Sequence, residues 1–143
     1  MDVLGVLMRW LHLLGAAVAV GGAIYAARVV APAMEGLSTD AKGKLAAGFA
    51  QRLRPLAFAV IAVMLVTGVY NIMMHVAGKP VGYHIVLTLK LLLALHVLTM
   101  LFLLSIPPGA NPARDARRPR LMAGAAISGL VVLLLSAVLT QGF

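Results

Sequence analysis

The chain has no cysteine, and this absence removes several kinds of site. Without thiols there are no disulfides, no thiolate metal sites, no iron–sulfur clusters and no covalently attached c-type haem. Any haem that this chain binds must therefore be held without covalent attachment.

Acidic residues are almost as scarce, with four in 143 residues. All of them lie outside the long apolar stretches, at Asp2, Glu35, Asp40 and Asp115. A mechanism that uses two buried carboxylates as general acid and base is therefore excluded. The sequence also has no G-x-G-x-x-G, no P-loop and no H-E-x-x-H, so none of the sites that these motifs build is predicted.

Hydrophobic residues are abundant in this chain: they make up 62% of it, and only 11% of the residues are charged. A membrane-spanning helix needs about 20 apolar residues. Four runs are long enough, at about residues 3–30, 55–76, 84–106 and 120–140. Short connections make successive helices antiparallel. We therefore predict an all-α fold, a single integral membrane four-helix bundle over residues 1–143 with up-down-up-down topology.

The connection between the first two runs is predicted to form a helix of its own. The first helix is expected to end near Arg28, with Pro32 after it, and Ser38 is a typical N-cap. Residues 41–53 alternate apolar and basic side chains at near-helical spacing. This pattern predicts a short amphipathic helix on the cytoplasmic surface, with Pro55 in the first turn of the second span.

The net charge of +8 is concentrated at two of the three connections. Nine basic residues flank them: Arg28, Lys42, Lys44, Arg52, Arg54, Arg114, Arg117, Arg118 and Arg120. The positive-inside rule places both connections in the cytoplasm, so both termini face outward from a bacterial-type inner membrane. Nucleic-acid binding is the alternative for so basic a chain. It is not predicted, because the charges lie at helix ends without interleaved aromatic residues.

The fourth run is rich in small residues, namely Ala123, Gly124, Ala125, Ala126, Ser128 and Gly129. Small residues at four-residue spacing let helices approach closely in lipid. We expect this helix to pack closely, either within the bundle or in a homo-oligomer.

Counted from the cytoplasmic helix ends, His12, Lys90 and His96 are predicted to lie within the membrane, whereas His75 and His84 fall at the outer interface. At 1.5 Å per residue, His12 lies about 24 Å from the cytoplasmic end, Lys90 about 25 Å and His96 about 16 Å. His12 and Lys90 are therefore predicted at the same depth. Ionisable residues inside a membrane are candidate functional residues by default.

His12 lies above a stripe of small residues on one face of its helix: Gly15, Ala16, Ala19, Gly22 and Ala23. Such a groove leaves room for a flat molecule, and a haem b with the imidazole as axial ligand suits it. The alternative is that the stripe only permits close helix contact and that His12 bonds a neighbouring carbonyl. His96 is the candidate second axial ligand, although its depth differs by about 8 Å and requires helix tilt.

Arg9 lies one turn outward of His12 on the same face. Together with Lys90 it would offset the charge of haem propionates. Arg9 would equally extend to the lipid headgroups.

A second group of candidate ligands lies near the outer turn, at Met73, Met74, His75, Tyr83 and His84. Thioether and imidazole groups suit Cu(I). Methionine is also common packing material, and no M-x-M or H-x-H spacing strengthens a copper site here.

Three stretches are similar to a four-helix membrane superfamily that includes the CopD copper-resistance proteins and the HemJ-type protoporphyrinogen oxidases. They are RWLHLLGAAVAVGGAIYAARVVAPA with His12, Gly22, Tyr25 and Arg28, RLRPLAFAVIAVMLVTGVY with Pro55 and Gly68, and YHIVLTLKLLLALHVL with Lys90. The resemblance covers the first three helices. The likeness to the HemJ-type proteins implies that His12 is a haem b ligand or a catalytic residue and that Lys90 supports it. The likeness to the CopD proteins implies instead that copper crosses the membrane through this protein.

Three functions are therefore open. The first is a b-type haem protein that exchanges electrons with a quinone or a redox protein, or that oxidises a porphyrinogen with Lys90 near the substrate carboxylates. The second is copper transport or resistance through Met73, Met74, His75 and His84. The third is a non-catalytic subunit of a larger membrane complex.

Overall fold

The computed structural model describes residues 2–109 and 111–141, and within them every regular element is a helix. The elements are α1 (Val3–Tyr25), η1 (Ala26–Val30), α2 (Ala31–Glu35), α3 (Thr39–His75), α4 (Val81–Ser105), α5 (Pro112–Ala116) and α6 (Arg118–Gln141). Four helical stretches are long and apolar enough to cross a membrane, at Val3–Glu35, Thr39–His75, Val81–Ser105 and Arg118–Gln141. The all-α prediction and its four long apolar helices are confirmed.

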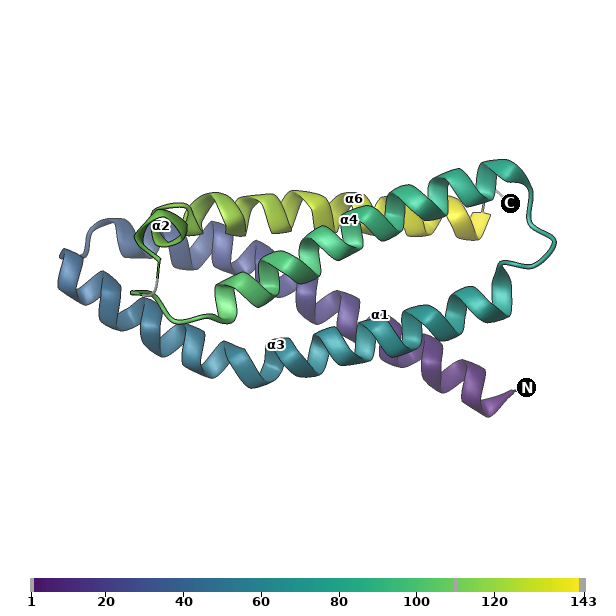
Figure 1. Cartoon of the computed structure of the whole chain (residues 1–143), viewed down its shortest axis with the longest axis horizontal. Helices are drawn as coiled ribbons and strands as arrows, with labels where there is room; N and C mark the ends of the chain where they lie inside the picture. The colour runs from purple at the N-terminus through teal and green to yellow at the C-terminus, as the bar shows by residue number, and fades with distance from the viewer. Residues whose placement is uncertain (1, 110, 142–143) are drawn as a thin grey trace.

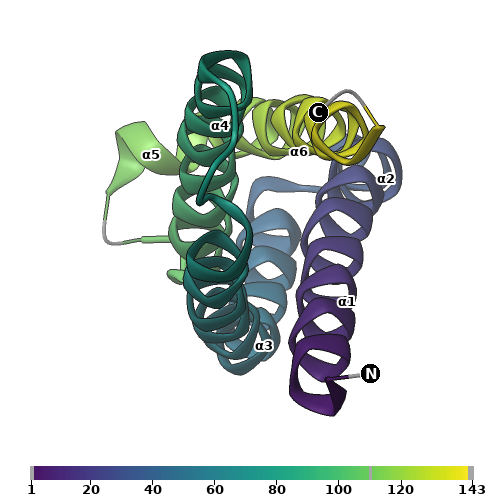
Figure 2. The same cartoon turned by 90° about the vertical axis from the view of Figure 1, so that its right-hand side faces the viewer.

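The four long helices run back and forth along the long axis of the molecule (Figure 1). α1 packs on α3 and α6, and α4 packs on the same two helices, so each long helix has two principal neighbours. Figure 2 shows this arrangement from the end at which α1 begins and α6 finishes. The connection from α2 to α3 and the short helix α5 lie at the opposite end (Figure 1).

The prediction that the first helix ends near Arg28 is wrong, because the helix continues through η1 and α2 to Glu35. η1 is a π-helix, in which the Ala31 N–H donates to the Ala26 carbonyl five residues earlier. Pro32 explains the change, because it has no N–H and its ring collides with the carbonyl four residues before it. A π turn widens the helix locally and accommodates the proline without a break.

The separate amphipathic helix predicted at residues 41–53 is also wrong, because those residues belong to the 37-residue helix α3. Ser38 caps this helix as expected, since its Oγ accepts from the Ala41 N–H at 3.3 Å. Pro55 lies inside α3 and not in a first turn. An internal proline removes one helical hydrogen bond and bends a helix, and α3 is visibly bent in Figure 1.

The interior of the bundle is built mainly from small and β-branched side chains. Ala19, Val60 and Val97 form one buried cluster from three different helices. The outer surface carries most of the large apolar side chains, and Leu92 and Leu134 are 63% and 64% exposed. A hydrocarbon exterior of this kind is compatible with contact to a lipid bilayer.

The small residues of the fourth span pack within the chain. A Cβ built on Gly129 would lie only 2.9 Å from Val20 Cγ2, so α1 and α6 approach each other closely at this point. Ala125 and Ala126 are buried on the same helix, whereas Ile127 is 65% exposed. Close packing of this helix is confirmed, and self-association stays a prediction.

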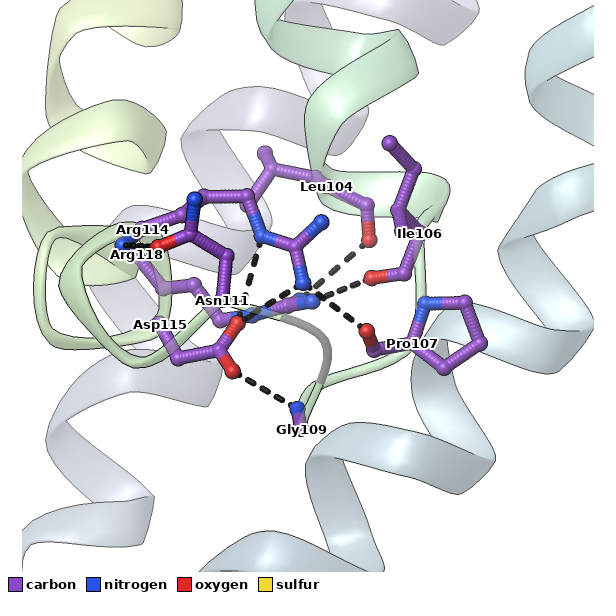
Figure 3. A network of polar contacts seen from close by, with 8 residues as sticks. All are labelled: Leu104, Ile106, Pro107, Gly109, Asn111, Arg114, Asp115 and Arg118. Atoms are coloured by element: carbon purple, nitrogen blue, oxygen red, sulfur yellow. Dashed lines mark hydrogen bonds and ion pairs between the residues drawn. The ribbon is translucent and has the colours of Figure 1, made fainter.

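The connection between α4 and α6 contains α5 and is organised by a buried arginine (Figure 3). Arg118 Nη1 donates to the Leu104 carbonyl at 3.3 Å, and Nη2 donates to the Ile106 carbonyl. These are carbonyls at the end of α4, which have no partner within their own helix. Arg118 therefore ties the start of α6 to the end of α4.

Asp115 holds this arginine in place and brings in a second one. Its Oδ1 accepts from Arg118 Nε at 3.3 Å and from Arg114 Nη2 at 3.0 Å. Its Oδ2 accepts from the Gly109 N–H at 2.7 Å. The Gly109 N–H first, and then the two arginines, hold the pKa of Asp115 below its usual value of 3.8.

Candidate functional site

His12 is half-buried on α1 and faces α3. Its Nδ1 lies 2.8 Å from Oγ1 of Thr67, which is 2% exposed. The Thr67 hydroxyl donates its single hydrogen to the Val63 carbonyl at 2.6 Å. Thr67 must therefore accept from His12, so the imidazole carries its proton on Nδ1 and a lone pair on Nε2.

Gly68 completes the contact of His12 with α3. A Cβ built on Gly68 would lie 3.7 Å from His12 Cε1, which is ordinary van der Waals contact. Sequence reasoning missed Thr67, although one signal was available. Thr67 is the only polar residue between Pro55 and Val69, and a lone hydroxyl in such a run calls for a partner.

Lys90 is half-buried on α4, within electrostatic range of His12. The common depth predicted for the two residues stays a prediction. Within residues 2–109 and 111–141, no hydrogen bond or ion pair joins the Lys90 ammonium to another group. An unpaired cation inside an apolar bundle costs free energy, so this ammonium is suited to receive an external anion or acceptor.

The structure does not bring His96 to His12. His96 is exposed on α4 and faces α6, where its Nε2 lies 3.8 Å from a Cβ built on Gly124. Its neighbour Val97 packs on Ala19, which is seven residues, or about 10 Å, along the helix from His12. The two imidazoles therefore differ both in depth and in the helix pair that they face.

The stripe of small residues below His12 is divided into two parts. Gly15 is covered by Met64, whose Sδ would lie 2.9 Å from a Cβ at that position, and Ala19 is buried in the core. A Cβ on Gly22 would meet nothing within 4 Å. Arg9 is exposed. Only the half of the stripe farther from His12 therefore borders open space.

That open space is a cavity of about 200 Å³ among α1, α3, α4 and α6. Apart from Tyr25, every side chain in its lining is hydrocarbon, and His12 does not border it. Sites for small molecules usually have volumes of about 300–1,000 Å³. The cavity is therefore too small for a porphyrin but has the chemistry to receive an apolar chain.

The copper hypothesis depends on four exposed side chains: Met73, Met74, His75 and His84. His75 Nδ1 donates to the Asn71 carbonyl at 2.9 Å, and His84 Nε2 donates to the Lys79 carbonyl at 3.2 Å. Each ring consequently keeps its other nitrogen as an acceptor. Across the described part of the chain, no three histidine or acidic side chains gather into a metal-binding group.

Comparison with known proteins adds no relative, because no family model, no curated protein and no solved structure matches this chain. The resemblance to the CopD and HemJ-like superfamily therefore stays a prediction from the three sequence stretches that suggest it.

Proposed function

We propose that this chain is a multi-pass membrane protein that binds haem b non-covalently through His12, for electron transfer or porphyrinogen oxidation. The hydrogen bond between His12 and Thr67 carries the proposal, because it fixes the proton on Nδ1 and leaves Nε2 with a lone pair for a ligand. Ligand histidines characteristically donate their other ring N–H to a neighbouring acceptor, which sets the tautomer and the ring orientation.

The donor set suits a haem. A neutral imidazole with a free Nε2 is a ligand that iron accepts, and when bound the haem would supply one-electron redox chemistry. The Lys90 ammonium lies near His12 and would neutralise a carboxylate at the edge of the tetrapyrrole, with exposed Arg9 as a second cation. His96 is left out of this ligand set, because it faces α6.

The available space limits where the group would be held. The cavity beside Gly22 is too small for a porphyrin and is not bordered by His12. The proposal therefore relies on the half of the bundle that contains His12, Thr67 and Lys90. If His12 were the only protein ligand, the bound haem would be better suited to substrate oxidation than to simple electron transfer.

The charge distribution supports an orientation in the membrane. The two connections flanked by nine basic residues lie at the end opposite to the start of α1 (Figure 1). We assign that end to the cytoplasm, with both termini outside an inner membrane. Under this assignment His12 and Lys90 lie in the outer half of the bilayer.

A reduced-minus-oxidised absorbance spectrum of the detergent-purified protein tests the function. We expect a Soret band of predominantly high-spin character that is lost in His12→Ala and kept in His75→Ala, the matched control. His96→Ala should leave the spectrum unchanged, and a change of spin state in that variant would restore His96 as a ligand. Absence of bound haem, or a Soret band that survives His12→Ala, would refute the proposal.

Copper handling is the second candidate, because His75 and His84 flank the 76–80 turn and each keeps a free ring nitrogen. A colourless preparation that retains copper, and loses it when both histidines become alanine, would favour this function. A preparation with neither haem nor copper would leave a role as a subunit of a larger membrane complex.

A further inference from the structure

A second and larger cavity lies at the basic end of the molecule, bordered by α2, α3, α5 and α6. Its volume is about 490 Å³, which is within the usual range for small-molecule sites. Most of its wall is apolar, and its four charged lining residues are Glu35, Lys42, Asp115 and Arg118. Neither the haem proposal nor the copper alternative uses this cavity.

The charges at this cavity are of two kinds. Asp115 and Arg118 are engaged with each other and with the end of α4, and Arg114 leaves that network with one surplus positive charge. Lys42 is half-buried, and no hydrogen bond or ion pair occupies its ammonium within the described residues. The Glu35 carboxylate on α2 likewise has no hydrogen bond or ion pair within the described residues. The cavity thus presents one available cation and one available anion to a ligand.

Phe49 connects the two cavities, because it borders both of them. Phe49 lines the charged cavity and also the hydrocarbon cavity of about 200 Å³ that Gly22 and Ala57 help to line. A cavity with charged groups in its wall, next to a cavity lined almost wholly by hydrocarbon, matches the division of an amphiphile into headgroup and chain.

We propose that the two cavities together bind one phospholipid, with its phosphate at Lys42 and one acyl chain passing Phe49 into the apolar cavity. An ammonium is a strong partner for phosphate oxygens. Glu35 complements a positive headgroup, so the lipid we expect is a phosphatidylethanolamine. This inference stands independently of the haem proposal, because it uses neither His12 nor Lys90.

The headgroup is tested by native mass spectrometry of the delipidated full chain titrated with phosphatidylethanolamine or phosphatidylglycerol. Lys42→Gln should weaken binding about tenfold, the loss expected for one charge-assisted hydrogen bond. Lys44→Gln is the matched control, because Lys44 is 80% exposed and pairs with Asp40 at 2.8 Å. Equal losses in the two variants would overturn the site. Phosphatidylglycerol binding as tightly as phosphatidylethanolamine would overturn the role of Glu35.

The acyl chain is tested by filling the apolar cavity. A Cβ on Gly22 or on Gly21 would meet nothing within 4 Å, but only Gly22 lines the cavity. Gly22→Leu should therefore weaken long-chain phosphatidylethanolamine at least tenfold, and Gly21→Leu should not. Inorganic phosphate and a short-chain phosphatidylethanolamine distinguish the two cavities, because Gly22→Leu should leave the binding of both unaffected. Identical long-chain affinities in two equally stable variants would refute the proposed path of the chain.

Discussion

Replacing Gly129 with alanine tests the close approach of α1 and α6. The new Cβ would lie 2.9 Å from Val20 Cγ2, 3.1 Å from Cγ1 and 3.4 Å from Cβ. Valine is stiff about χ1, so its side chain cannot turn away. Overpacking costs about 1–3 kcal/mol, whereas alanine gains about 1 kcal/mol in helix propensity over glycine. We therefore expect Gly129→Ala to lower the free energy of unfolding by about 1 kcal/mol.

Gly124→Ala is the matched control on the same helix. The nearest atom to its Cβ would be His96 Nε2 at 3.8 Å, so this variant should keep the propensity gain and be as stable as the parent or more stable. Equilibrium unfolding in mixed micelles with increasing denaturing detergent measures both variants. Adding Val20→Ala removes both clashing methyl groups, so the double-mutant cycle should show favourable coupling of about 2 kcal/mol, the size of the relieved overpacking. If Gly129→Ala matches Gly124→Ala, or if the coupling is zero, the described helix contact is wrong.

Two further predictions concern the polar groups. Thr67→Val should weaken haem binding by about ten- to a hundredfold in a Soret titration, because His12 loses the acceptor that sets its tautomer, and an unchanged affinity would contradict that role. Thr99→Val is its control, since the Thr99 hydroxyl donates only to the Leu95 carbonyl at 2.8 Å. The lowered pKa of Asp115 means that its contribution to stability is complete at neutral pH and is lost as the pH falls below 3.8 through the folded-state pKa. The melting temperature of Asp115→Asn should therefore be lower than that of the parent at pH 7 and should approach it as the pH falls below 3.8, and parallel curves would refute the linkage.

The two errors in the predicted fold have a common origin. Both errors come from predicting helix boundaries at Pro32 and Pro55, because a proline removes a hydrogen bond and crowds the preceding turn. Whether a helix then ends or continues is decided by what its flanks pack against. Here both helices continue, one through the π turn of η1 and the other as the bent α3. Local rules identify where the strain lies but not how the tertiary structure resolves it.

The sequence by itself determined the class of fold and the number of long apolar helices, because these depend on composition and on the length of apolar run that a span requires. Only the tertiary structure decided which neighbour each side chain meets: Thr67 for His12, Gly124 for His96, and a cavity for Gly22. The rotation of a helix about its own axis is set by packing against the other helices. In an almost uniformly apolar chain, no hydrophobic stripe in the sequence predicts that rotation.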